Sequence, residues 1–199
     1  MGARSEDGGA GDPLPGAGAV YIFHRTGSNT WDTGVKLISS ELEAGDQFGI
    51  AVAMEGSHLA VAATIEAGGP GGPVNSAGAV YVYQQLGVNA WGNETKLAAS
   101  DQQPNDEFGT SVSISGGHIV VGARLEDGGS GDPLRDSGAI YSFTLVGGNV
   151  WNADLIIRPT DSIMDSLFGS AVDVDNGTVI VGRPDDQPGN LPGSAYIFR

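Results

Sequence analysis

Residues 48–63 read FGIAVAMEGSHLAVAA, and the pattern returns as FGTSVSISGGHIVVGA in residues 108–123 and FGSAVDVDNGTVIVGR in residues 168–183. In each copy, a Phe-Gly pair precedes an alternation of larger and smaller side chains, a short turn with glycine and a nearly continuous apolar run. Alternation with a period of two predicts a β-strand, and the apolar run predicts a second strand that is covered on both faces. The stretch therefore predicts a β-hairpin that recurs every sixty residues.

The rest of the chain keeps this period. GAVYIF, GAVYVY and GAIYSF begin at residues 18, 78 and 138, and GSAYIF begins at residue 193 after a shorter loop. A fourth segment starts at a tryptophan and ends in GVKL, ETKL or DLII. We label the expected strands A to D: A follows the Phe-Gly pair, B is the apolar run, C is the GAVYIF-type segment and D runs from the tryptophan.

The repeat predicts an all-β fold. No stretch combines helical periodicity with helix caps, and turn residues recur at short intervals. Four-stranded antiparallel units with apolar B and C strands describe the blades of a β-propeller better than a sandwich, and a β-solenoid is the structural alternative. We expect one repeat array over residues 1–199, with a partial unit at 1–47, full units at 48–107 and 108–167, and a partial unit at 168–199. This gives about three and a half blades, which do not close a ring of the usual size alone.

Nine residues form the signature of the repeat, and we expect them to build the scaffold. They are Phe48, Gly49, Phe108, Gly109, Phe168, Gly169, Trp31, Trp91 and Trp151. A large side chain that recurs in every unit favours packing, and a platform on which glycan rings stack is the functional alternative for the tryptophans. Lys36 and Lys96 share one position of strand D, which favours a role in protecting the sheet edge.

Charge and composition restrict the partners. A net charge of −15 argues against nucleic acid and anionic membrane surfaces, because both attract basic proteins. The absence of cysteine excludes disulfides and cysteine-ligated zinc. No apolar run approaches the roughly 20 residues of a membrane span. We expect a protein or glycan ligand, or further copies of the chain, in an oligomer or as part of a longer chain.

The repeated motifs resemble the FG-GAP repeat of integrin α-subunit propellers and, more closely, of bacterial surface proteins. Gly2-Ala3-Arg4 and Gly122-Ala123-Arg124 match the second half of that motif, and Gly182-Arg183-Pro184 matches it more loosely. The resemblance implies a β-propeller fold and a location outside the cell or on a bacterial surface.

The resemblance also bears on metal binding. In the integrin relatives, calcium binds the A–B hairpin through a DxDxDG loop. The corresponding hairpins here are MEGSH (54–58), ISGGH (114–118) and VDNGT (174–178), which offer at most Asp173 and Asp175. We therefore assign no metal site and expect no cofactor, and we leave calcium binding open.

Acidic residues gather in two classes of loop. Antiparallel strands place the B–C and D–A loops on one face of the array, and most of the 24 acidic residues fall in those loops. The ligand-binding face of the integrin relatives is built from the same loop classes. The candidate binding residues lie in two acidic B–C loops and are Glu6, Asp7, Asp12, Glu126, Asp127 and Asp132. Their shared EDGG-GDPL pattern is either a cation site or an acidic, glycine-rich turn.

The repeat also argues against catalysis. A catalytic constellation is unique to one place, whereas nearly every polar residue here has a copy elsewhere, so we assign no catalytic residue. We expect a noncatalytic extracellular binding or adhesion module that acts through its acidic loop face. The alternative is a structural subunit or an excerpt of a larger extracellular assembly or fibre, completed by neighbouring chains.

Overall fold

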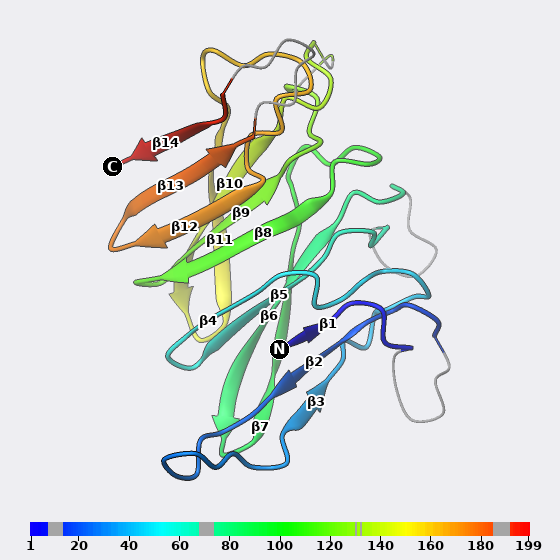
Figure 1. Ribbon diagram of the computed structural model, residues 1–199, viewed down its shortest axis with the longest axis vertical. Helices are drawn as coiled ribbons and strands as arrows, with labels where there is room; N and C mark the ends of the chain where they lie inside the picture. The colour runs from blue at the N-terminus through cyan, green and yellow to red at the C-terminus, as the bar shows by residue number, and fades with distance from the viewer. Residues whose placement is uncertain (8–13, 68–73, 130, 132, 185–191) are drawn as a thin grey trace.

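The computed structural model describes residues 1–7, 14–67, 74–129, 131, 133–184 and 192–199, and Figure 1 shows a row of small sheets. These residues form strands and turns, and no helix among them is long and apolar enough to cross a membrane. The predicted all-β class is confirmed.

The strands form four antiparallel sheets, in which neighbours in the chain are neighbours in the sheet. We call the sheets blades 1 to 4. Blade 1 contains β1 (Gly2–Ala3), β2 (Ala19–Ile22) and β3 (Val35–Leu37). Blade 2 contains β4 (Val52–Glu55), β5 (His58–Ala63), β6 (Ala79–Gly87) and β7 (Ala90–Leu97). Blade 3 contains β8 (Phe108–Ser115), β9 (His118–Ala123), β10 (Ala139–Gly147) and β11 (Val150–Ile157). Blade 4 contains β12 (Ala171–Asp175), β13 (Thr178–Arg183) and β14 (Ser194–Phe198).

This architecture confirms the predicted propeller-type array. Blades 2 and 3 contain all four strand positions, A to D, and the described residues of the four blades form no closed ring (Figure 1). The hairpins β4–β5, β8–β9 and β12–β13 turn on one side of the array, and the ends of β5 and β9 point to the opposite side (Figure 1). We call this opposite side the loop face, because the described parts of the B–C and D–A loops lie there (Figure 1).

Each Phe-Gly pair forms a tight turn that leads into strand A. The Ile50 amide donates a hydrogen bond to the Gln47 carbonyl at 3.1 Å, and Gly49 adopts a φ of +92° that favours glycine. In blades 2 and 4 the regular strand starts after this turn, at Val52 and Ala171, whereas in blade 3 the pair lies within β8, which shifts its register between Phe108 and Ser111.

The phenylalanine of each pair is a centre of blade packing. Phe48, Phe108 and Phe168 are fully buried. Their rings lie edge to face, 5.2 to 5.7 Å between centroids, against the strand-C tyrosines Tyr81, Tyr141 and Tyr196. The Phe108 backbone crosses so close to Gly78 that a Cβ there would lie 2.1 Å from the Phe108 carbonyl oxygen. The GAVYVY segment therefore has to begin with glycine.

The B strands lie between apolar layers, as their composition predicts. Every residue of β5 and β9 except the first histidine is buried. Three apolar clusters fill the spaces between blades 1 and 2, 2 and 3, and 3 and 4. Burial of one such large side chain stabilises the fold by about 1.5 to 3 kcal/mol, so contacts between blades carry much of the stability.

The A strands of successive blades lie side by side, which explains their small side chains. The Ser111 hydroxyl of β8 donates to the Gly169 carbonyl at 2.7 Å, and the Ser113 hydroxyl donates to an Asp173 carboxylate oxygen at 2.9 Å. Small residues allow this approach of neighbouring backbones. Position A is therefore the place where the blades converge.

The three tryptophans differ in exposure although they share a repeat position. Trp151 is 8% exposed and packs with the residues of blade 2, Trp91 is half-buried against the cluster between blades 1 and 2, and Trp31 is 61% exposed. Each packed indole lies against the blade that precedes its own. Trp91 and Trp151 thus act in packing, and Trp31 presents its ring to solvent.

Candidate functional site

The glutamates of the acidic B–C loops are held by cations of their own blades. Glu66 is 1% exposed, and its carboxylate lies 2.7 Å from Lys96 Nζ. Glu126 is 4% exposed and lies 2.5 Å from the Arg158 guanidinium. Glu6 pairs in the same way with Lys36. The predicted binding residues Glu6 and Glu126 therefore take part in ion pairs that tie the B–C loop to strand D.

These pairs change the interpretation of the strand-D lysines. The D strands β7 and β11 form edges of blades 2 and 3, as predicted. Lys96, however, also reaches Glu41 at 3.3 Å and is mostly covered. The Lys96 side chain is mostly covered because it pairs with the buried Glu66 carboxylate of the loop. Ion pairing with a loop glutamate, which Lys36 also shows, therefore explains the recurrence of this lysine better than edge protection.

The aspartates next to these glutamates shape the loops. An Asp7 carboxylate oxygen accepts a hydrogen bond from the Gly16 amide at 2.9 Å, and Asp127 accepts one from the Asp136 amide at 2.7 Å. The carbonyls of Asp7 and Asp127 accept further bonds from the amides of Leu14 and Leu134. Asp12 and Asp132 lie outside the described residues. The first acidic residues of the EDGG-GDPL pattern therefore organise the turn itself.

The structure brings no metal-binding cluster together in the part that it describes. Among those residues, no group of three or more histidine, aspartate or glutamate side chains has an arrangement that could hold a metal ion. Glu6 and Asp7 belong to blade 1 and Glu126 and Asp127 to blade 3, so blade 2 separates the two loops. The expectation of no metal site, with calcium binding left open, stays a prediction that solution experiments have to test.

Two buried aspartates of the loop face hold their protons to a higher pH than a free aspartate does, because their pKa values are raised. Asp46 and Asp106 occupy the same repeat position and are 5% and 3% exposed. Burial raises the pKa of both, and nearby carboxylates, Glu126 foremost, help to raise the pKa of Asp106 to about 7. Both carboxylates still accept a hydrogen bond from a backbone amide. For Asp106 the donor is the Gln103 amide, at 2.9 Å. The number of acidic residues therefore overstates the negative charge of this face.

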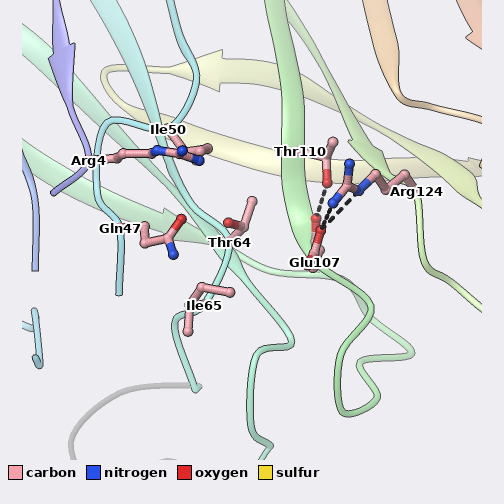
Figure 2. A pocket seen from close by; sticks show the side chains of 8 residues that line it. All are labelled: Arg4, Gln47, Ile50, Thr64, Ile65, Glu107, Thr110 and Arg124. Carbon is pink, nitrogen blue, oxygen red and sulfur yellow. Dashed lines mark hydrogen bonds and ion pairs between the residues drawn. The ribbon is translucent and has the colours of Figure 1, made fainter. Parts of the chain in front are cut away.

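A pocket of about 420 Å³ opens on the loop face where blades 1, 2 and 3 meet. We call it the arginine pocket, and Figure 2 shows Arg4 and Arg124 on opposite sides of it. Its lining comprises Arg4, Gln47, Ile50, Thr64, Ile65, Glu107, Thr110 and Arg124. Most of these residues directly follow strand B or flank a Phe-Gly pair. The pocket is therefore formed by equivalent positions of neighbouring repeats.

The two arginines of the pocket differ in their partners. Arg124 Nε lies 3.0 Å from a Glu107 carboxylate oxygen, and the Thr110 hydroxyl donates a hydrogen bond to the Glu107 backbone carbonyl at 2.8 Å (Figure 2). Arg4 is exposed and makes no hydrogen bond or ion pair with any described residue. The pocket thus offers one guanidinium that is available to a ligand, within a chain of net charge −15.

Sequence reasoning did not find this pocket. The Gly-Ala-Arg segments were recognised as parts of a repeated motif, and Gln47 and Glu107 immediately precede Phe-Gly pairs. The only signal in the sequence was that Arg4 and Arg124, two of the nine lysines and arginines, both directly follow strand B. That signal indicates a shared position, and the convergence of three blades becomes visible only in the structure.

Comparison with known proteins agrees with the architecture. The family model of the FG-GAP repeat matches residues 31–83, 91–143 and 151–198, each from a tryptophan into the next strand C. No curated protein matches the chain significantly. FG-GAP repeats are typical of extracellular or surface proteins of adhesion type and are generally noncatalytic. Because the matches cover most of its length, the chain belongs to the FG-GAP repeat family.

Proposed function

We propose that the chain is a noncatalytic extracellular binding or adhesion module that contacts a protein or glycan through its loop face. The observation that carries the proposal is the arginine pocket, which residues of blades 1, 2 and 3 line together. Rigid blades fix its walls, and loops on a rigid scaffold are where binding sites usually occur. The acidic loops around the pocket select against anionic surfaces, and Arg4 supplies one point of attraction for a carboxylate or another acceptor group.

The chemistry of the pocket suits recognition rather than reaction. Its only titratable groups are the two arginines and Glu107, and Glu107 is already paired with Arg124. A general base needs an available site for the proton, which this pair does not provide. A guanidinium, two threonines and a glutamine instead supply hydrogen-bond donors and acceptors for a polar ligand.

A binding screen with charge-reversal variants tests this proposal. Wild-type protein is applied to a glycan array and to a panel of immobilised extracellular proteins, with and without calcium. We expect at least one ligand whose affinity falls tenfold or more in Arg4→Glu. The matched control is Arg25→Glu, since Arg25 lies beyond β2 on the opposite side and bonds only to carbonyls of its own turn. Absence of any ligand, or equal losses in the two variants, would contradict the proposal.

A second candidate function is a structural one, as a subunit of a larger extracellular assembly. The outer sides of the first and last blades favour it, because Trp31, Ile180 and Ile197 are 61%, 47% and 61% exposed. Exposed apolar sheet faces of this kind usually have a partner. Light scattering tests the idea: we expect oligomers at micromolar concentration, and a monodisperse monomer at all concentrations would rule out assembly from copies of this chain.

A further inference from the structure

The tyrosine of strand C has a repeated partner for its hydroxyl group. Tyr141 and Tyr196 share one position of the repeat with Tyr81. The Tyr141 hydroxyl donates a hydrogen bond to an Asp101 carboxylate oxygen at 2.9 Å, and the Tyr196 hydroxyl donates to Asp161 at 2.9 Å. Asp101 and Asp161 also share a repeat position, in the D–A loop that leads into the blade of the tyrosine. In blades 3 and 4 the buried end of the tyrosine is therefore tied to that loop.

Blade 2 lacks this hydrogen bond. Glu41 stands at the position of Asp101 and Asp161, and its carboxylate lies 3.3 Å from Lys96 Nζ. Tyr81 is fully buried, and its hydroxyl group has no hydrogen-bond partner among the residues that the structure describes. Native proteins satisfy nearly all buried hydroxyl groups with a protein group or an ordered water, because an unpaired one costs free energy. Blade 2 therefore contains a donor whose acceptor is not a side chain.

Charged groups surround this hydroxyl. Lys96 Nζ lies 5.6 Å from the centre of the Tyr81 ring. Burial, followed by the nearby carboxylates of Glu66 and Glu41, raises the pKa of Tyr81, so the hydroxyl stays protonated and acts as a donor. The Lys96 ammonium has three N–H donors, and the structure gives it two carboxylate partners, Glu66 at 2.7 Å and Glu41 at 3.3 Å. The Tyr81 hydroxyl and one N–H of Lys96 are thus left as donors close to carboxylates.

We propose that blade 2 binds one ordered water molecule among Tyr81, Lys96 and Glu41. The water accepts hydrogen bonds from the Tyr81 hydroxyl and from the third N–H of Lys96, and it donates to the Glu41 carboxylate. Buried waters typically make about three such bonds. The water takes the part that the aspartate carboxylate has in blades 3 and 4, and it ties strands C and D to the D–A loop. None of its three residues lines the arginine pocket, so the site does not depend on the proposed function.

Crystallography at a resolution that shows ordered waters tests the site. We expect electron density for a water within hydrogen-bond distance of Tyr81 Oη and Lys96 Nζ, and none beside Tyr141 Oη, which serves as the matched control. Glu41→Asp gives blade 2 the side chain of the other blades, so its carboxylate should bond to Tyr81 directly and the water should leave. A wild-type Tyr81 hydroxyl that bonds to a protein group, or that has no density beside it, would overturn the proposal. A water that stays in Glu41→Asp would contradict its role as a substitute for the carboxylate.

A pair of conservative variants tests the same site in solution. Tyr81→Phe and Tyr141→Phe each remove one hydroxyl group and keep the ring that packs on the phenylalanine of the Phe-Gly pair. If the water is bound, both hydroxyl groups are hydrogen-bonded, so we expect both variants to unfold at a lower urea concentration than the wild type. If the Tyr81 hydroxyl had no partner, its removal would relieve a buried unpaired group. An unchanged or raised urea midpoint in Tyr81→Phe, next to a lowered one in Tyr141→Phe, would therefore overturn the proposal.

Discussion

Trp151 and Trp31 hold the same position in the repeat, yet the first lies in the closed junction between blades 2 and 3 and the second on the outer side of blade 1. The exposed fractions of their side chains are 8% and 61%. Trp151 is covered because blade 2 supplies His58 and the carbonyl groups that its segment binds. The comparison teaches that the preceding blade determines how much a signature residue contributes to stability.

The largest effect is expected where two backbones touch in the closed junction. Gly78→Ala places a Cβ 2.1 Å from the Phe108 carbonyl oxygen, so blade 3 has to shift. We expect a loss of more than about 4 kcal/mol in the free energy of unfolding, measured by urea denaturation. Gly45→Ala is the control, because Gly45 also has a positive φ, +93°, but no atom lies within 4 Å of its added Cβ. Similar losses in both would show that backbone strain, not contact between blades, decides the outcome.

The tryptophans themselves provide the next test. Trp151→Ala removes a buried indole and leaves a cavity, so we expect the free energy of unfolding to fall by about 3 to 5 kcal/mol. Trp31→Ala removes a mostly exposed ring and should cost less than about 1 kcal/mol. Denaturation of the two variants under identical conditions measures the difference. If Trp31→Ala were as destabilising as Trp151→Ala, position in the array would not matter.

The loop ion pairs extend the comparison from apolar to charged groups. Glu126→Gln weakens a pair whose carboxylate is almost fully covered, and it should cost about 2 kcal/mol because Arg158 then keeps only the more exposed Asp101 as a charged partner. Glu6→Gln in blade 1 weakens a more exposed pair and should cost less than about 1 kcal/mol. Thermal denaturation at low salt distinguishes them. A larger loss in Glu6→Gln would contradict the view that inner blades depend more on such pairs.

The smallest effect concerns pH. Burial raises the pKa of Asp106 in the fold to about 7, above the usual value in an unfolded chain, so the folded state binds the proton more tightly. The stability due to this proton is complete below about pH 4 and is lost as the pH rises to about 7. Urea denaturation at pH 5 and at pH 7 measures how the free energy of unfolding changes between the two conditions. In Asp106→Asn this change should be smaller than in the wild type, with a difference on the order of 1 kcal/mol. An unchanged slope would show that the carboxyl group is already ionised at pH 5.

Much of the fold was predictable because each strand carries a local pattern. The alternation after Phe48, the apolar run of β5 and the GAVYVY segment depend on neighbouring residues and on their own periodicity. Their recurrence every sixty residues predicted a repeated four-stranded blade. The exact start of strand A was not predictable, because it differs between copies that share the Phe-Gly turn: β8 begins at Phe108, whereas β4 begins at Val52.

The candidate site was less predictable, because it depends on contacts between blades. The acidic loop pattern was recognised, but the sequence did not show that Lys96 lies over Glu66 or that Arg158 reaches Glu126 from a different position in the repeat. The arginine pocket unites residues separated by more than a hundred positions. Sequence spacing indicates which residues are equivalent, whereas only the stacking of blades shows which residues meet.

The B–C loops share one further feature. The amides of Gly18, Gly78 and Gly138 donate to the carbonyls of Glu6, Glu66 and Glu126 at 2.8 to 3.0 Å, so each loop is closed at its base by the same hydrogen bond. Sequence beyond this bond can lengthen, shorten or change without moving the strands below it. The protein is accordingly suited to loop grafting: foreign peptides inserted into these loops would be displayed in a row, at a spacing fixed by the blades, on one face of a cysteine-free scaffold.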